Sequence, residues 1–435
     1  MEMTDVKKTI TVNALARVEG EGALTIRFSG GRPQSAELRI FEPPRFFEAL
    51  LVGRGYQEAP DITARICGIC PVAYQMSACH AMEDALGLDI SPEIRALRRL
   101  LYAGEWIESH VLHMFMLHAP DFLGRADVVE LSEAFPEQVA AALRMKKAGN
   151  AIVNLLGGRE IHPINVRVGG FWRIPTREEL RALAPELEAT REQMLSALDW
   201  IADFDFPDFE HDVELVALRH DRDYPMSEGR VVSSRGLDIT PRDFEAHFEE
   251  RQVPHSTALH CMLRERAGYL CGPLARLNLN ADHLRPAARG AVDRVGLALP
   301  CKNPFKSILA RGIEVIQAAD EALEIIDTFQ GVQDAPPSIR PRAGEGFACT
   351  EAPRGILYHH YRLAEDGSIA SAKIVPPTSQ NQATIEADLL SIAERLVDLP
   401  KREATELAER TVRNYDPCIS CSTHFLDLRF TEEEP

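Results

Sequence analysis

The sequence predicts a mainly helical protein with small β elements, and three observations support this prediction. Residues 9–40 alternate apolar and polar side chains, as strands do. From about residue 90, apolar residues recur at the spacing of long helices. The chain has 435 residues, more than the roughly 250–300 residues of a usual single core, so we expect one very large core or two lobes.

The N-terminal strands come first. Residues 9–12 and 23–28 alternate, Ser29-Gly30-Gly31 has the composition of a turn, and residues 36–40 resume the alternation. This order predicts a small antiparallel N-terminal sheet.

The helical part follows. Ser91-Pro92-Glu93 predicts a helix start, with a capping hydroxyl, a proline at the first helical position and a carboxylate in the first turn. The apolar run after it continues to Pro120, and its breadth predicts a helix buried on most sides. Thr176 with Glu179, and Thr240-Pro241, indicate two more helix starts. Helices are also expected over 135–157, 177–204, 305–329, 382–398 and 401–413, and loops or short irregular structure over 205–240 and 331–348.

The charge balance excludes one class of partner. With 48 Lys and Arg against 66 Asp and Glu, the formal net charge is −18, which argues against nucleic-acid binding. Solubility explains such a charge, and a docking surface for a basic partner remains an alternative. Residues 1–10 lack the apolar segment of a signal peptide, and no stretch approaches the roughly 18–20 apolar residues of a membrane span. We therefore expect a cytoplasmic protein without a membrane span, although a signal on a partner would leave the same sequence.

Two Cys-x-x-Cys pairs are the strongest chemical signal. Cys67 and Cys70 form one pair, Cys418 and Cys421 the other, and four thiolates suit zinc, nickel or iron. The separation of 348 positions between the pairs (418 − 70) excludes a compact zinc ribbon, whose pairs lie roughly 15–20 residues apart. A catalytic or redox metal, a structural zinc assembled by the fold, and redox-active or unrelated thiols remain open on spacing alone.

The neighbours of these cysteines resemble the large subunit of nickel–iron hydrogenases over nearly the whole chain. The similarity lies in short segments that occur in the family's order: Arg17-Val18-Glu19-Gly20, Arg65-Ile66-Cys67-Gly68-Ile69-Cys70, Gly157-Gly158 with His162-Pro163, Glu351-Ala352-Pro353-Arg354-Gly355, and Asp416-Pro417-Cys418-Ile419-Ser420-Cys421 followed by His424. The resemblance implies the large-subunit fold, a long-helix bundle plus the small N-terminal sheet. It also implies a domain over 1–424, with a β region at about 9–40 and a helical body at about 90–424.

The resemblance also implies the cofactor. Cys67 and Cys418 would bind nickel terminally, and Cys70 and Cys421 would bridge nickel to an iron that carries CO and cyanide. The reaction would be the reversible, heterolytic oxidation of H2 to protons and electrons.

Four further residues take roles from the family. Glu19 would accept protons from a terminal thiolate, Cys418 being preferred, because a carboxylate beside an acidic thiol can exchange protons near neutral pH. Arg354 would lie over the open metal face and against a cyanide ligand, where a rigid cation can polarise H2. Asp121 and Asp416 would anchor that arginine, although Asp121 could instead be an ordinary helix-end residue.

A second ion is implied near the first. Glu48 would bind magnesium or a similar divalent ion together with His424 and a backbone carbonyl near Asn381 and Gln382.

The electrons need other chains. The sequence has no iron–sulfur pattern such as C-x₂-C-x₂-C and no G-x-G-x-x-G after a strand. We therefore expect an iron–sulfur small subunit. The motifs are most similar in sequence to those of the cytoplasmic NAD(P)-coupled or sulfur-reducing branch, so we also expect flavin/NAD(P)-binding and ferredoxin-like subunits. Residues 425–435 would be a C-terminal extension that a maturation endopeptidase removes. An H2-sensing regulatory subunit and a zinc-stabilised structural subunit are the competing functions.

Overall fold

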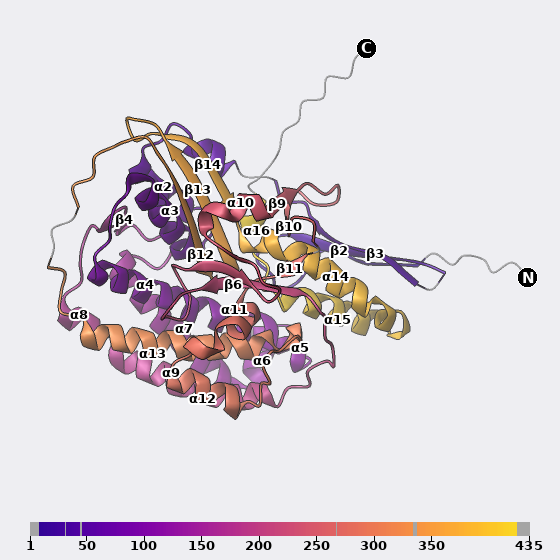
Figure 1. The fold of residues 1–435 in the computed structure, drawn as a ribbon. Helices are drawn as coiled ribbons and strands as arrows, with labels where there is room; N and C mark the ends of the chain where they lie inside the picture. Colours follow the sequence, from indigo (N-terminus) through magenta and orange to yellow (C-terminus); the bar gives the residue numbers. More distant parts are fainter. Residues whose placement is uncertain (1–7, 31, 44–45, 267, 334–336, 424–435) are drawn as a thin grey trace, which may run out of the picture.

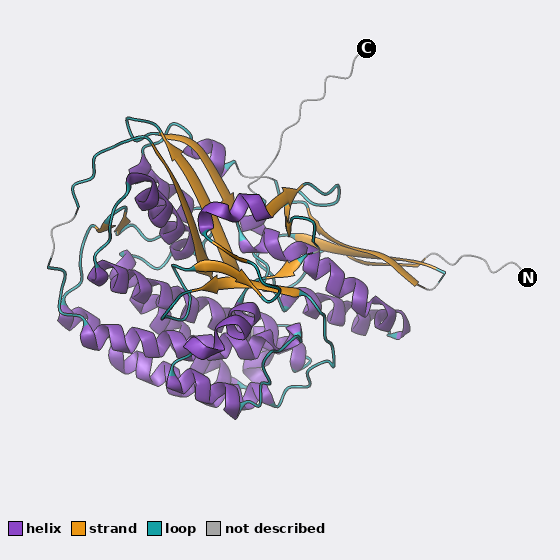
Figure 2. Cartoon of the chain, in the orientation of Figure 1, coloured by secondary structure: helices purple, strands orange, loops and turns teal. Residues whose placement is uncertain are grey.

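The computed structural model describes residues 8–30, 32–43, 46–266, 268–333 and 337–423. Helices predominate, and the strands form small separate sheets (Figure 2). The long helices lie together in a bundle, with a twisted antiparallel sheet on one side of it (Figure 1). The predicted class, mainly helical with small β elements, is confirmed.

The bundle is built on α4 (Pro92–Val111), α7 (Pro136–Gly157), α9 (Ala184–Ala202) and α13 (Ser307–Thr328). α4 packs against α7 and α13, and α13 packs against α9. α4 begins as predicted, with the Ser91 hydroxyl accepting a hydrogen bond from the Ile94 amide. Nearly every residue of its last three turns is buried, which explains why its apolar run is broader than one stripe.

The chain after α4 stays helical but changes its winding. Residues Leu112–His118 form a π-helix, and α5 (Ala119–Phe122) follows directly. π-helical insertions re-aim the side chains beyond them and are frequent at functional sites. The predicted helix to Pro120 is therefore present, with its winding widened over residues 112–118.

The N-terminal sheet is also confirmed. Strands β1 (Lys8–Val12), β2 (Gly22–Ser29) and β3 (Arg32–Ile40) pair antiparallel in sequence order. Their far end extends away from the body of the protein (Figure 1). The loop between β1 and β2 returns to the interior and carries Glu19.

One sheet was not predicted from the sequence. β12 (Gly344–Ala352), β13 (Gly355–Leu363) and β14 (Ile369–Val375) form an antiparallel meander, so the expected loop over 331–348 ends at residue 343. Helix α3 (Pro71–Leu86) packs on β12 and β13. The inner halves of these strands are buried without alternation, and such strands lack the period-two pattern that sequence reasoning relies on.

Other expectations need correction in detail. The region 205–240 contains β6 (Glu214–Arg219), β7 (Arg230–Ser233) and β8 (Asp238–Ile239), which join β11 (Tyr269–Leu270) in the order β11-β6-β7-β8. The helix expected at Thr240 is only a 3₁₀ turn, Pro241–Asp243, and the short α10 (Phe244–His247). The helix expected over 177–204 divides into α8 (Arg177–Arg181) and α9, because Pro185 begins a new helix.

The C-terminal helices α14 (Pro377–Asp398) and α15 (Lys401–Arg413) match their predicted segments, with α14 beginning five residues earlier. The remaining elements are α1 (Phe47–Leu51), η1 (Tyr56–Glu58), α2 (Ala59–Ala64), α6 (Val128–Ala134), β4 (Val166–Arg167), β5 (Gly170–Phe171), β9 (Phe248–Arg251), β10 (His260–Leu263), α11 (Pro273–Asn280), η4 (Ala281–His283), α12 (Pro286–Arg294), η5 (Pro304–Lys306) and α16 (Ile419–Ser422).

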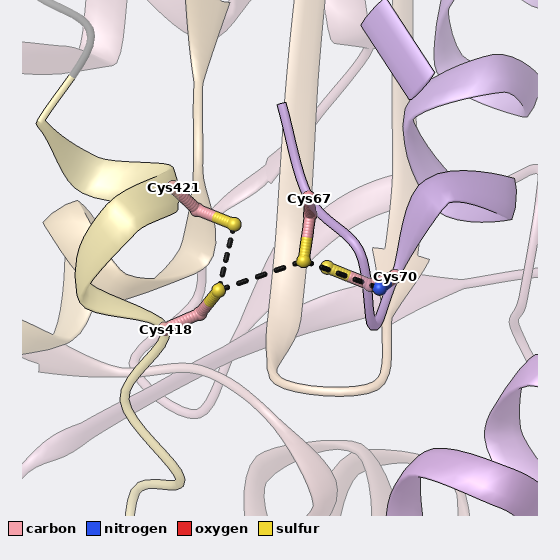
Figure 3. A group of neighbouring side chains, drawn as sticks. All are labelled: Cys67, Cys70, Cys418 and Cys421. Atoms are coloured by element: carbon pink, nitrogen blue, oxygen red, sulfur yellow. Dashed lines mark hydrogen bonds between the residues drawn. The ribbon is translucent and has the colours of Figure 1, made fainter. Parts of the chain in front are cut away.

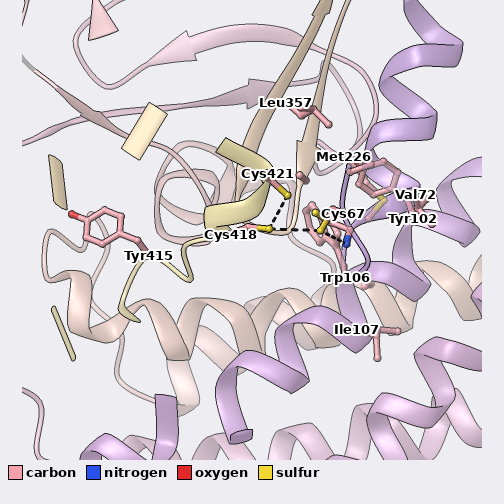
Figure 4. Packing of buried hydrophobic residues seen from close by; sticks show 14 of the residues in the cluster. Cys67, Val72, Tyr102, Trp106, Ile107, Met226, Leu357, Tyr415, Cys418 and Cys421 are labelled. Carbon is pink, nitrogen blue, oxygen red and sulfur yellow. Dashed lines mark hydrogen bonds between the residues drawn. The ribbon is translucent and has the colours of Figure 1, made fainter. Parts of the chain in front are cut away.

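The buried apolar residues form one very large core and a smaller cluster under β6, β7 and β13. The large core contains all four paired cysteines, together with residues from α3, α4 and β13 (Figure 4). Within the described ranges, no helix is long and apolar enough to cross a lipid bilayer.

Candidate metal centre

Two loops from opposite ends of the chain bring the four cysteines together (Figure 3). Cys67 and Cys70 lie in the loop that leads into α3, whose first residue is Pro71; Cys418 precedes α16 and Cys421 lies on it. The four sulfurs lie within 4.8 Å of one another, and each cysteine is at most 4% exposed. The Cys67 and Cys418 Sγ atoms are 3.6 Å apart. The predicted soft metal site is therefore assembled across 348 residues.

The C-terminal loop is held by the loop that carries Glu19. Glu19 and Cys418 form a parallel β-bridge, in which the Ile419 amide donates to the Glu19 carbonyl at 3.0 Å. The Cys418 amide donates to the Thr378 hydroxyl at 2.9 Å. Gly20 has φ +87°, and a Cβ there would lie 2.8 Å from the Ile419 Cβ. Only glycine lets the two loops approach this closely.

The N-terminal loop is held by a buried carboxyl group. Glu105 of α4 accepts hydrogen bonds from the amides of Val72 at 2.6 Å and Ala73 at 3.0 Å, and so caps the first turn of α3. The His162 Nδ1 lies 2.7 Å from the Ala64 carbonyl oxygen, three residues before Cys67. Both contacts fix the backbone from which the first cysteine pair projects.

The thiols interact strongly with one another. Hydrogen bonding from Cys418, Cys421 and Cys70 lowers the pKa of Cys67 well below its ordinary value. Burial raises the pKa of Cys418 and of Cys421 well above the ordinary value. Four buried thiolates together would be strongly unfavourable without a cation, so this donor set fits a thiolate-binding metal centre.

Arg354 lies in the turn between β12 and β13 and faces the C-terminal loop. Its Nε donates to the Asp416 carbonyl oxygen at 2.7 Å and its Nη2 to the Asp416 Oδ1 at 3.1 Å. Burial opposes its charge, but Asp416 and the thiolates of the site raise its pKa well above the ordinary value. Its Nη1 is buried without a hydrogen-bond partner among the described residues. An unpaired buried donor fits a polar ligand such as an iron-bound cyanide.

The structure separates the two aspartates that were expected to anchor Arg354. Asp416 contacts it directly, whereas Asp121 receives hydrogen bonds from Arg17 Nη2 at 2.5 Å and from the Nε and Nη2 of Arg413, both at 2.7 Å. Arg413 ends α15, and its carbonyl accepts from the Asp416 amide. Asp121 therefore supports the backbone before the second cysteine pair.

Glu19 reaches the sulfur that was expected to exchange protons with it. The Cys418 thiol donates to Glu19 Oε2 at 3.1 Å, and the Ser420 amide donates to the same oxygen at 3.1 Å. The carboxylate is thus oriented by backbone and directed at one of the four sulfurs.

The residues expected at the magnesium site are placed only in part. Glu48 is half-buried, accepts a hydrogen bond from the Ile374 amide at 2.7 Å, and has a pKa raised by burial to about 8. The Gln382 side chain is buried and donates to the Leu259 carbonyl oxygen. His424 and the extension 425–435 lie outside the described residues. The magnesium site therefore stays a prediction.

Two supporting residues were missed by sequence reasoning. Glu105 could have been identified from the sequence, because a carboxylate inside an apolar helix is costly unless it is hydrogen-bonded. Thr378 could not have been identified, since a single hydroxyl at the start of a helix is common.

The fold and the buried four-cysteine set together define a protein with a transition-metal centre. Residues 45–142 and 271–424 match the family described as "Nickel-dependent hydrogenase". The chain belongs to the nickel–iron hydrogenases, as a catalytic large subunit in which Cys67, Cys70, Cys418 and Cys421 form the Ni–Fe site.

Its relatives cover nearly the whole chain. The alpha subunit of sulfhydrogenase 2 from Pyrococcus furiosus is 34% identical over 96% of this chain and 100% of that protein. The beta subunit of the NAD-reducing hydrogenase HoxS from Cupriavidus necator is 28% identical over 97% of this chain and 96% of its own length. A crystal structure of an NAD⁺-reducing [NiFe]-hydrogenase in the H2-reduced state superimposes with a TM-score of 0.87 at 28% identity, covering 97% of this chain and 100% of that one.

Proposed function

We propose that this subunit catalyses H2 ⇌ 2 H⁺ + 2 e⁻ in a cytoplasmic complex that exchanges the electrons with NAD(P). The observation that supports it best is the 3.1 Å contact between Cys418 Sγ and Glu19 Oε2. A structural metal site has no need of a proton acceptor beside one of its sulfurs, whereas heterolytic cleavage of H2 does.

Within this proposal, Cys67 and Cys418 would bind nickel alone, Cys70 and Cys421 would bind both nickel and iron, and the iron would carry CO and cyanide. When bound, the Ni–Fe centre supplies the redox chemistry and the affinity for H2. The chain supplies the enclosure, since all four cysteines are buried in the large core.

The proton path begins at Cys418. The Sγ of Cys418 takes the proton and Glu19 Oε2 receives it, because the two atoms are already in hydrogen-bond contact. Arg354 contributes a fixed positive charge above the thiols, held by two hydrogen bonds to Asp416. Arg354 acts in catalysis through its charge, and Asp416 and Asp121 are positioning residues.

The electrons leave through other subunits. We propose an iron–sulfur small subunit, joined by flavin/NAD(P)-binding and ferredoxin-like subunits, so that the complex carries out H2 + NAD(P)⁺ ⇌ NAD(P)H + H⁺. The relatives named for sulfhydrogenase and NAD reduction support this coupling. NAD(P) as the coenzyme also supports a cytoplasmic location.

Three measurements test the proposal. Infrared spectroscopy of the purified complex should show bands of iron-bound CO and cyanide. H2-dependent formation of NADH or NADPH should accompany reduction of a redox dye. Zinc without nickel would identify a structural subunit instead, and a loaded Ni–Fe centre with negligible dye reduction would identify an H2 sensor.

Two further proposals concern a second metal ion near the Ni–Fe centre and the processing of the C-terminus. We propose that Glu48, the backbone carbonyl of Gln382 and His424 bind magnesium or a similar ion, and that an endopeptidase removes residues 425–435 after nickel insertion. Intact-mass measurement of the active, nickel-loaded subunit should give a chain ending at His424. A retained extension in active enzyme would contradict the cleavage.

A further inference from the structure

A second group of metal-ligand side chains lies apart from the cysteines. His255 is in the connection between β9 and β10, His260 is the first residue of β10, and Glu386 is on α14. One potential ligand atom from each residue lies within 4.8 Å of the other two. β9, β10 and α14 are neighbours in the fold (Figure 1). The hairpin and the helix thus bring the three side chains to one point.

The local contacts leave part of this group unpaired. His255 Nε2 and Glu386 Oε1 are 2.7 Å apart, and the same Glu386 oxygen accepts from the Leu38 amide at 2.9 Å. His260 is 3% exposed, and its Nε2 is buried without a hydrogen-bond partner among the described residues. Five other histidines among the described residues also have a buried ring nitrogen without a partner, so the feature that distinguishes His260 is its position beside His255 and Glu386.

The surroundings also suit a cation. The side chains of His255 and Glu386 are 21% and 17% exposed, so one side of the group is open to solvent while His260 forms its buried side. Imidazole nitrogens and a carboxylate oxygen gather at this opening, and all three are ligands that divalent transition ions accept.

We propose that His255, His260 and Glu386 form a second metal site that takes a borderline divalent transition ion such as Zn²⁺. Two imidazoles and one carboxylate are a common set of protein ligands for this ion, with water completing the coordination. Binding replaces the hydrogen bond between His255 Nε2 and Glu386 Oε1, and the imidazole proton moves to the other ring nitrogen.

An ion at this site would stabilise the helix and the strand that hold the second cysteine loop of the Ni–Fe centre. α14 carries Thr378, which accepts a hydrogen bond from the Cys418 amide, and Glu386 two turns further on holds the Leu38 amide of β3. An ion on Glu386 would therefore tie α14, β3 and the β9–β10 connection together. Its role is structural, and it does not depend on the electron acceptor of the complex.

The experiment uses the intact complex with its Ni–Fe centre loaded, so that the four cysteines are occupied. Loosely bound ions are removed with EDTA, and Zn²⁺ and then Co²⁺ are titrated. Zinc content after gel filtration should rise by one equivalent per large subunit. Co²⁺ should give the visible absorption of a four- or five-coordinate site, and Zn²⁺ should abolish it.

Three variants decide the location of the ion. Glu386→Gln keeps an oxygen for the Leu38 amide and loses the charge, and His255→Gln loses one imidazole; each should weaken Zn²⁺ binding by at least about tenfold. His247→Ala removes an exposed imidazole whose Nδ1 contacts the Asp243 carbonyl oxygen, and this variant should bind Zn²⁺ as the parent does. Infrared bands of the loaded centre confirm that each variant is folded.

The outcomes are distinct. The proposal fails if the parent binds no additional equivalent, or if Glu386→Gln and His255→Gln bind it unchanged. It also fails if Glu48→Gln removes the ion, because the ion would then belong to the magnesium site. If Glu386→Gln does not fold, the His255→Gln titration decides alone.

Discussion

Replacing Glu19 with glutamine tests the proton path most directly. The carboxylate oxygen 3.1 Å from Cys418 Sγ is the first acceptor outside the metal centre. In the parent protein the Ser420 amide donates to Glu19 Oε2. A glutamine has the same shape, and its side-chain oxygen can still accept this hydrogen bond. The substitution therefore removes proton acceptance and leaves the loop contacts in place.

The expected effect is large because the step lies on the reaction path. A positioned general base contributes about 10²–10⁴-fold to a rate, which corresponds to about 3–5 kcal/mol of activation free energy. H2 oxidation with a redox dye should fall by this factor. Nickel content and the CO and cyanide bands should stay at the parent values, because no metal ligand changes.

The matched control is Glu21→Gln, which removes an exposed carboxylate two residues further along. Its activity should stay within about twofold of the parent, as for most surface substitutions. If Glu19→Gln with a full nickel complement loses less than about tenfold, the carboxylate is not the proton acceptor. If nickel is lost instead, Glu19 serves assembly and the reasoning also fails.

Three further predictions follow from the same geometry. Arg354→Lys loses the planar group that holds Asp416 through Nε and Nη2 and leaves Nη1 for a ligand. It should lower dye reduction by about 10²–10³-fold with the metals retained, and unchanged activity would show that the guanidinium is only structural. Gly20→Ala places a Cβ against the second cysteine loop at a residue with φ +87°. It should lower the nickel content and destabilise the fold by about 1–3 kcal/mol. The control Gly53→Ala, at φ +81° with open space around it, should retain its nickel. Burial raises the pKa of Glu108 from 4.5 to about 8, so the folded state keeps a proton that the unfolded state loses, and its contribution to stability declines between those values. Glu108→Gln should therefore reduce the drop in melting temperature between about pH 5 and about pH 9, and an unchanged drop would contradict the assignment.

The long helices could be predicted from the sequence because their signals are local. The Ser91-Pro92 start and the Thr176–Glu179 capping box are both present, since a cap depends only on the residues beside it. The sheet of β12–β14 could not be predicted in this way, because strands covered on both faces lose their alternation. Pro185 also signals a helix break, but the helical pattern on both sides of it led us to predict one helix over 177–204.

The sequence by itself determined the chemistry of the site. Two identical cysteine spacings indicated a site of four thiols and left metal binding and redox use both open. The segments around Glu19, Arg354 and the cysteines then indicated the family by resemblance, because these signals lie in short contiguous segments. Only the tertiary structure decided which groups meet. In the structure Glu19 contacts Cys418, and Asp416 contacts Arg354. Asp121 contacts Arg17 and Arg413 instead. Two histidines lie beside Glu386. Such contacts join residues from 62 to 399 positions apart. The packing of α14, α15 and the sheets sets them, and no local pattern encodes that packing.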